Sequence, residues 1–370
     1  MKTGSPRRFA IDIPQSALDD LKARILNARL PEKETVGDWE QGIPLDYVKD
    51  LAAYWARDYD WRKCEARLNA LPNFLIGIDG LDIHFIHVVS ANPAARPLLL
   101  THGWPGSVLE FLNVIGPLSN DFHLVIPSLP GYGFSGKPAE AGWGLERIAR
   151  AWNELMLALG YPRYFAQGGD WGSAVTSEIG SQHLGACAGI HVNMVVGPLP
   201  EDLSDLTDFE KRALGRMQWY RDKDAGYSTQ QSTRPQTIGY ALADSPVGQM
   251  AWIVEKFHNW TDCDGHPENV VSREHLIDNV MLYWLTNSAA SSARLYWESF
   301  GKFRGGTVPV PTGCSLFPKE LFSLSRRWAE KRYTQIVYWN EHEKGGHFAA
   351  VERPEEFVSD VRSCFNAMTL

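Results

Sequence analysis

Strand and helix patterns alternate along most of this chain, and this alternation limits its fold more than any other feature of the sequence. Leu81–Val88 alternates apolar and polar residues like a half-exposed strand, and residues 97–101 form the continuous apolar run typical of a buried strand. A helix with one apolar face is predicted between Leu145 and Leu159. Strands that alternate with helices predict a parallel sheet covered on both faces. Further short apolar runs occupy residues 122–126, 164–166, 189–196, 310–316 and 335–339.

Two parts of the chain depart from this alternation. Residues 15–31 and about 45–68 show helical spacing, so the N-terminal region is predicted to be mostly helical. Strand signals disappear from about residue 197 to residue 303, where Ser245-Pro246 and Ser272 mark helix starts. We therefore predict an α/β core with a helical insertion that covers a site like a lid. The predicted segments are an N-terminal region (1–80), core (81–197), lid (198–303) and core (304–370).

Composition excludes several classes of protein. A net charge of -8 argues against nucleic acid as a partner, because binding to its phosphates requires clustered lysine and arginine. No apolar run approaches the ~18 residues of a spanning helix, so no membrane anchor is predicted. The five cysteines are scattered and odd in number, which fits neither a disulfide framework nor a zinc site. This pattern predicts a cytoplasmic location.

The most informative motif lies in residues 164–173, where an apolar strand runs into Gly168-x-Asp170-x-Gly172 and a helix follows. This pattern is that of the nucleophile elbow of α/β-hydrolases, with aspartate where an esterase has serine. Glycines flank the nucleophile because the turn is too tight for side chains. The alternative is that Asp170 merely caps an ordinary helix.

Other motifs, which follow one another in the chain order that α/β-hydrolases use, favour a catalytic site. His102-Gly-Trp104-Pro-Gly106 follows a buried strand, where such folds place a loop that donates a backbone N–H to an oxyanion. The second donor is expected to be the N–H of Trp171. The Trp104–Pro105 bond is a candidate cis peptide. His347, on a glycine-rich loop after a strand, is the predicted base.

The third member of the predicted triad is an acid between the nucleophile and the histidine in chain order. Glu320 follows a candidate strand and is preferred over Glu298 and Glu341. A metal site is a weaker alternative, because its candidates lie on a loop without the spacing of a zinc-binding helix. These candidates are Glu341, His342, Glu343 and His347. Gly131-x-Gly133-x-x-Gly136 matches a dinucleotide fingerprint, but no helix opens at its last glycine.

An aspartate nucleophile indicates the type of electrophile. Attack by serine on a saturated carbon would give a stable ether, whereas attack by Asp170 gives an ester that water can hydrolyse. Epoxides and haloalkanes are the two main classes of such substrates. An epoxide additionally requires proton donors for its alkoxide.

The sequence resembles the microsomal-type branch of the epoxide hydrolases over nearly its whole length. The resemblance implies the α/β-hydrolase fold and an N-terminal domain that wraps around the core. It also implies that Tyr227 and Tyr296 are the paired phenols that hold the epoxide oxygen. The matching motifs are Phe9-x-Ile-x-Ile-Pro14 with Leu30-Pro31, His102-Gly-Trp-Pro105, Gly168-Gly-Asp-Trp-Gly-Ser173, Gly226-Tyr227 with residues 233–248, Ser292-Ala-Arg-Leu-Tyr296, Phe317-Pro-Lys-Glu320 and Gly345-Gly-His-Phe-Ala-Ala350.

These observations predict an enzyme that opens a small-molecule epoxide to a diol and needs neither a metal nor a cofactor. Asp170 attacks a ring carbon, and His347, oriented by Glu320, activates the water that hydrolyses the ester. The backbone N–H groups of Trp104 and Trp171 stabilise the oxyanion. A haloalkane dehalogenase and a ligand receptor without activity are the alternatives. The sequence leaves open whether the chain forms a homodimer.

Overall fold

A nine-stranded sheet with the order β1-β2-β3-β5-β4-β6-β7-β8-β9 forms the centre of the computed structural model, which describes residues 1–182, 184–301 and 305–370. The six neighbouring strands β5, β4, β6, β7, β8 and β9 run parallel to one another. The strands β1, β2 and β3 pair antiparallel, and β3 is also antiparallel to β5. The predicted mostly parallel sheet is thus confirmed. The strands are β1 (Arg7–Arg8), β2 (Asn73–Ile78), β3 (Leu81–Val88), β4 (Arg96–Thr101), β5 (Phe122–Pro127), β6 (Tyr164–Gly168), β7 (Cys187–Val192), β8 (Thr312–Leu316) and β9 (Ile336–Glu341).

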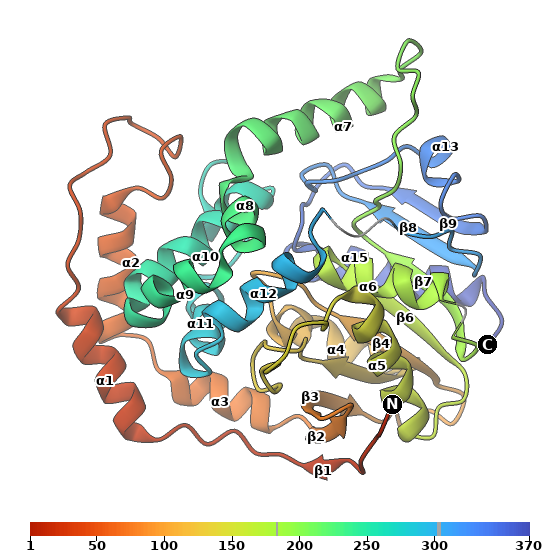
Figure 1. Cartoon of the computed structure of the whole chain (residues 1–370), viewed down its shortest axis with the longest axis horizontal. Helices are drawn as coiled ribbons and strands as arrows, with labels where there is room; N and C mark the ends of the chain where they lie inside the picture. Colours follow the sequence, from red (N-terminus) through yellow and green to blue (C-terminus); the bar gives the residue numbers. More distant parts are fainter. Residues whose placement is uncertain (183, 302–304) are drawn as a thin grey trace.

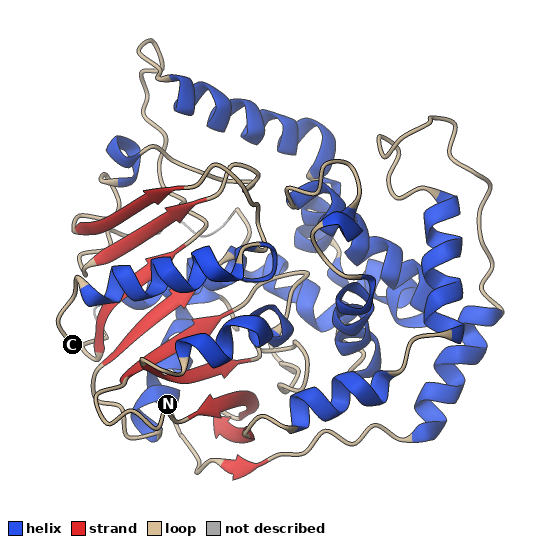
Figure 2. Cartoon of the chain, turned by 180° about the vertical axis from the view of Figure 1, so that it is seen from behind, coloured by secondary structure: helices blue, strands red, loops and turns tan. Residues whose placement is uncertain are grey.

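Helices cover both faces of this sheet. Helices α5 (Leu145–Ala158) and α6 (Asp170–Ser181) lie on the face seen in Figure 1, and α4 (Leu112–Leu118) and α15 (Pro354–Asn366) lie on the face seen in Figure 2. Every residue of β6 is buried between these layers. Strands that are covered on both sides must be apolar throughout, which explains the continuous apolar runs of the sequence.

A block of helices separates β7 from β8 and packs beside the sheet (Figure 1). As predicted, Ser245 caps one of them by accepting a hydrogen bond from the N–H of Gly248 (2.9 Å), and Ser272 caps another through the N–H of His275 (3.2 Å). The helices are α7 (Asp208–Trp219), the π-helix η2 (Tyr220–Asp224), α8 (Gly226–Thr233), α9 (Pro235–Asp244), α10 (Pro246–Trp260), η3 (Pro267–Asn269), α11 (Arg273–Leu285) and α12 (Ala289–Ser299).

The N-terminal region is less uniformly helical than the sequence predicts. The helix expected over residues 15–31 is α1 (Gln15–Leu26), which ends before Asn27. The helix expected over 45–68 is two helices, α2 (Leu45–Arg57) and α3 (Trp61–Asn69), because the side chain of Asp60 accepts the N–H of Arg62 and starts a new helix. The region also contributes β1 and β2, which the apolar pattern did not reveal.

The N-terminal region connects the sheet to the helical block. Figure 1 shows the chain starting along the sheet edge, reaching α1 and α2 on the far side of the block, and returning through α3. The division at residues 80 and 197 stays a prediction, and the predicted boundary at 303/304 lies outside the described residues. Within the described part of the chain, no helix combines the length and apolarity needed to cross a bilayer. The remaining short helices are η1 (Val108–Phe111), α13 (Arg326–Ala329) and α14 (Ala349–Glu352).

Candidate active site

Four loops that follow parallel strands carry the predicted site residues of the core. Trp104 follows β4, Asp170 follows β6, Glu320 follows β8, and His347 follows β9. The carboxyl ends of parallel strands lie at the same edge of a sheet, which is where α/β proteins place their ligands. The topology therefore brings together side chains that are far apart in the sequence.

The turn at Asp170 has the strained geometry of a nucleophile elbow. Asp170 has a φ of 50°, a left-handed conformation that is uncommon for a residue with a side chain. A Cβ atom on Gly172 would lie 1.9 Å from the carbonyl oxygen of Thr101, and one on Gly168 would lie 2.1 Å from the oxygen of Gly172. Glycine is therefore required at both positions. The alternative role of Asp170 as a helix cap is wrong, because the N-cap is Gly169 and has no side-chain bond.

The carboxylate of Asp170 is held between a backbone amide and an imidazole. Its Oδ1 accepts the N–H of Trp104 at 2.7 Å, and its Oδ2 lies 3.2 Å from Nε2 of His347. The side chain remains 16% exposed, so it is accessible to a small molecule. The Trp104–Pro105 bond is cis, as the sequence predicts. The amide of Trp171 lies in the first turn of α6, where N–H groups lack intrahelical acceptors.

The imidazole of His347 forms a buried ion pair with Glu320. Its Nδ1 lies 2.7 Å from Oε1 of Glu320, and the two side chains are 2% and 1% exposed. Burial lowers the pKa of His347, but the charges and hydrogen bonds of Glu320 and Asp170 outweigh it and raise the pKa well above its ordinary value. The competing acids lie elsewhere: Glu298 accepts the N–H of Gly142, and Glu341 accepts the indole N–H of Trp339.

The alternative metal cluster is not assembled. Nε2 of His342 lies 2.6 Å from Asp360, whereas His347 is bonded to Glu320. The two imidazoles therefore serve different carboxylates. Among the residues that the structure describes, no three histidine, cysteine, aspartate or glutamate side chains are grouped so that they could hold a metal ion.

Two phenols from the helical block pack around Trp104. Tyr227 on α8 stacks on the Trp104 indole with 4.9 Å between ring centroids, and Tyr296 on α12 meets it edge-on at 5.8 Å. The two phenol rings are 5.7 Å apart and nearly perpendicular. Burial raises the pKa of both phenols well above the ordinary value, and the negative charge of Asp170 contributes to this rise. Both phenols are therefore protonated at neutral pH beside the carboxylate.

Sequence reasoning missed two further groups at this site. The hydroxyl of Tyr220 is bonded to that of Tyr227 at 3.3 Å and to Oγ of Ser228 at 2.8 Å, and burial raises the pKa of Tyr220 to about 12. Glu110, in η1, lies close enough for the charges of His347 and Asp170 to act on it, and burial raises its pKa to about 8. The position of Glu110, shortly after the predicted oxyanion loop, could have indicated it in the sequence. No feature of the sequence indicated Tyr220.

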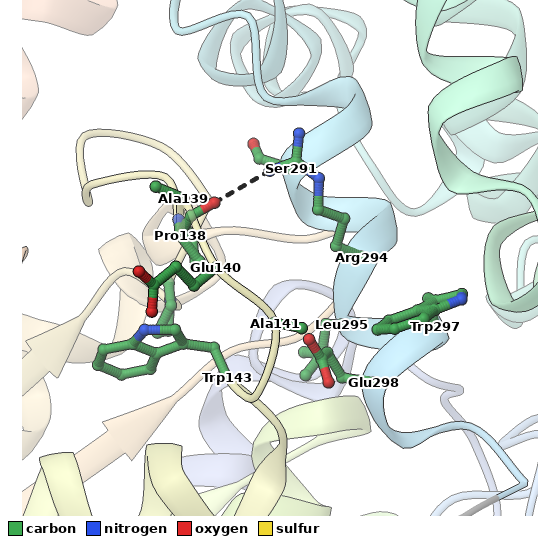
Figure 3. A pocket seen from close by; sticks show the side chains of 11 residues that line it. Pro138, Ala139, Glu140, Ala141, Trp143, Ser291, Arg294, Leu295, Trp297 and Glu298 are labelled. Atoms are coloured by element: carbon green, nitrogen blue, oxygen red, sulfur yellow. Dashed lines mark hydrogen bonds between the residues drawn. The ribbon is translucent and has the colours of Figure 1, made fainter.

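Helix α12, which carries Tyr296, is fastened to the core loop over residues 131–142. Nη1 of Arg294 donates to the carbonyl of Pro138 at 3.2 Å, and Glu298 accepts the N–H of Gly142 at 2.8 Å. Figure 3 shows these two side chains of α12 beside the loop, around a cavity of about 420 Å³ that none of the predicted catalytic residues lines. Hydrogen bonds to backbone atoms thus fix the helix that positions Tyr296.

The glycine-rich segment within this loop does not form a phosphate site. The N–H of Gly131 donates to the carbonyl of Gly136, and the N–H of Gly136 donates to that of Asp82. These amides are therefore occupied within the protein, and the next helix begins only at Leu145. The segment is a structural turn, as the delayed helix predicted.

Comparisons with known proteins agree with this geometry. Residues 6–111 match the family model described as the epoxide hydrolase N terminus, and residues 96–238 match that of the alpha/beta hydrolase fold. A Stigmatella aurantiaca protein provisionally named an epoxide hydrolase is 51% identical, over 97% of this chain and 84% of its own. Epoxide hydrolase 1 of Sus scrofa is 36% identical, over 97% of this chain and 88% of its own.

A solved structure extends the likeness to three dimensions. The epoxide hydrolase of Aspergillus niger superposes with a TM-score of 0.91 at 36% identity, covering 99% of this chain and 97% of that one. The chain therefore has the α/β-hydrolase fold and belongs to the epoxide hydrolases.

Proposed function

We propose that this enzyme converts an epoxide and water to a vicinal diol through an ester on Asp170. The observation that carries the proposal is the position of the Asp170 carboxylate, which lies on a strained elbow between the N–H of Trp104 and the imidazole of His347. A carboxylate there can attack carbon to form an ester, and water that adds to the carbonyl of this ester then releases the diol and regenerates the carboxylate. The names of the relatives support an epoxide as the small-molecule substrate.

Ring opening requires a proton for the departing oxygen. Tyr227 and Tyr296 are buried, protonated phenols that pack on Trp104 beside the nucleophile. As the bond between Asp170 and carbon forms, the epoxide C–O bond breaks and a phenol donates its proton to the alkoxide. A halide would need no such donor, so the paired phenols favour an epoxide over a haloalkane.

Hydrolysis of the ester requires a neutral base. In the free enzyme, the charges of Asp170 and Glu320 keep a proton on His347. Esterification removes the charge of Asp170, so the pKa of His347 falls and its proton can return to the phenolate. His347 then takes a proton from water, which attacks the ester carbonyl while the N–H groups of Trp104 and Trp171 stabilise the oxyanion. Collapse releases the diol and regenerates the Asp170 carboxylate.

The test traps the ester. His347→Gln should still be alkylated but should accumulate enzyme that is heavier by one substrate mass, with the label on the peptide that contains Asp170. In wild-type enzyme, one turnover in ¹⁸O-labelled water should place the label in the Asp170 carboxylate. If the first-turnover diol carries the solvent label instead, water attacks the epoxide directly and Asp170 is not the nucleophile.

A further inference from the structure

A buried lysine in the helical block lies against the ring of Tyr227. Lys256, on α10, is 4% exposed, and its Nζ lies 4.7 Å from the centroid of the phenol ring. Trp104 stacks on the same ring with an interplanar angle of 9°. The ring of Tyr227 thus contacts both the indole of Trp104 and the ammonium of Lys256. Neither nucleophilic attack by Asp170 nor activation of water by His347 depends on the charge of Lys256.

The cation is held in place by acidic partners. Nζ of Lys256 lies 2.9 Å from Oδ1 of Asp224 and 2.7 Å from Oε2 of Glu255. Asp224 is fully buried and also accepts hydrogen bonds from Asn259 (3.0 Å) and from the indole N–H of Trp260 (2.6 Å). Three partners from α10, Glu255, Asn259 and Trp260, therefore fix the positions of the ammonium and of the Asp224 carboxylate.

Removing an ammonium from water is costly, and its attraction to buried carboxylates repays that cost only when the geometry is excellent. An apolar side chain of similar length could fill the same space, and such replacements of buried ion pairs are often neutral or stabilising. A protein would retain such a cation despite its cost if the charge favoured a step of the reaction. The ring that it contacts belongs to one of the two predicted proton donors.

We propose that Lys256 is a positioning residue that makes Tyr227 a stronger proton donor during ring opening. A cation near an aromatic ring is attracted to its electron density, and this attraction increases when negative charge develops on the phenol oxygen. Proton donation to the alkoxide develops that charge. Lys256 therefore stabilises the transition state of alkylation more than the ground state, which is the condition for a rate effect. The proposal rests on the proposed function of Tyr227.

The other groups around Tyr227 make such a cation useful. Burial, and then the neighbouring Tyr296, Tyr220 and Asp170, raise the pKa of the Tyr227 phenol well above its ordinary value. A phenol in this setting is a weak acid. Two carboxylates, Asp224 and Glu255, bond to Lys256 and oppose its effect on the phenol.

The experiment measures alkylation and ester hydrolysis separately, by stopped-flow tryptophan fluorescence with a chromogenic epoxide such as a nitrostyrene oxide. Lys256→Met should slow alkylation about tenfold and leave hydrolysis nearly unchanged. The basic limb of the alkylation rate against pH should move upward, because loss of the cation makes the phenolate harder to form. Lys256→Arg, which keeps the charge, should restore part of the rate.

A second variant guards against a folding defect, since Lys256→Met leaves Asp224 buried without its cation. In Asp224→Asn/Lys256→Met both charges are absent, and alkylation should remain slow. Arg67→Met is the control, because it removes the cation from another buried carboxylate, Asp278, on α11. This control should lower stability without changing the ratio of alkylation to hydrolysis.

A double-mutant cycle separates this proposal from the proposed function. In a Tyr227→Phe background no phenol remains to be assisted, so adding Lys256→Met should slow alkylation no further. If the lysine change slows alkylation equally in both backgrounds, or if the double-neutral variant recovers the wild-type rate, Lys256 is structural and the inference fails. If Tyr227→Phe itself has no effect on alkylation, the role of Tyr227 in the proposed function fails instead.

Discussion

Replacing Glu320 with glutamine tests the predicted triad by removing a charge while preserving shape. Oε1 of Glu320 accepts from Nδ1 of His347 (2.7 Å) and from the N–H of Leu321 (2.6 Å). Oε2 is buried without a hydrogen-bond partner among the described residues. A glutamine whose oxygen takes the Oε1 position therefore keeps both bonds and places its amino group where no bond is lost. The tautomer of His347 should be preserved.

The magnitude follows from the separation of the two charges. Two unit charges about 4 Å apart interact by about 4 kcal/mol at an effective dielectric constant of about 20. Part of that energy is recovered by the retained hydrogen bond, which leaves a loss of about 2–4 kcal/mol for the imidazolium that forms during hydrolysis. This loss corresponds to a decrease of roughly 30-fold to 10³-fold in the rate of ester hydrolysis. Alkylation, which does not require His347 as a base, should change much less.

The assay is single-turnover stopped-flow fluorescence, because Trp104 and Trp171 lie next to Asp170, where the ester is expected to form. Glu320→Gln should show rapid alkylation followed by a slow second phase, and intact-protein mass spectrometry should detect the accumulated ester. Glu341→Gln is the matched control, because its carboxylate bonds to the indole of Trp339 rather than to His347. Hydrolysis within threefold of the wild-type rate in Glu320→Gln would show that the charge of Glu320 is not needed.

Three further predictions concern the phenols, the elbow and the base. Tyr227→Phe or Tyr296→Phe should each slow alkylation by up to about 10²-fold and together nearly abolish it, so a double variant with full activity would exclude both residues. Gly172→Ala should lower the free energy of unfolding by about 2–4 kcal/mol, measured by urea denaturation, because its Cβ would lie 1.9 Å from a carbonyl oxygen. Asp170→Asn should lower the pKa of His347, because one of the carboxylates that raise this pKa is removed. The pKa can be followed by NMR, and an unchanged value would contradict the prediction.

The stability prediction has a control within the same protein. A Cβ on Gly215, in the middle of α7, meets nothing within 4 Å. Gly215→Ala should therefore leave the protein unchanged or stabilise it by up to about 1 kcal/mol, because alanine favours helix. An equal loss of stability in both variants would show that close backbone contact at the elbow is not the cause.

The members of the predicted triad could be located from the sequence because they are tied to backbone constraints. The elbow around Asp170 needs glycines at fixed positions, and the loops of Glu320 and His347 follow apolar strands. Once the strands are parallel, their carboxyl ends must share an edge. Local sequence and topology were therefore sufficient to bring these three residues together.

Groups that depend on packing between helices could not be located in the same way. Lys256 and Tyr220 contact Tyr227 from different helices, and no motif in the surrounding sequence points to either residue. A charged residue in an amphipathic helix is normally read as exposed, yet Lys256 is buried. Only the three-dimensional structure shows that Lys256, among the lysines in its described ranges, has lost most of its contact with water.

The apolar pattern also predicted one strand with the wrong bounds and failed to reveal another. The strand predicted over 189–196 is β7 (Cys187–Val192), because Met194 and Val195 are buried in the loop that follows rather than paired in the sheet. Burial alone therefore extended the apolar run beyond the strand. β2, in contrast, was concealed, although Asp79-Gly80 after it is a typical hairpin turn in which both residues have positive φ.

Trp104 connects the two halves of the site, and this connection leads to a prediction that separates them. Its backbone N–H bonds to Asp170, whereas its indole stacks on Tyr227 and meets the edge of Tyr296. Trp104→Leu would keep the N–H but remove the aromatic surface on which both phenols rest. Ring opening, which needs the phenols in register with the epoxide oxygen, should therefore slow by roughly 10-fold to 10²-fold. Ester hydrolysis, which needs the N–H and His347, should change little. Single-turnover measurements on Trp104→Leu give both rates, with mass spectrometry to follow the ester. An equal fall in the two rates would mean that the indole supports the whole loop rather than the phenols alone.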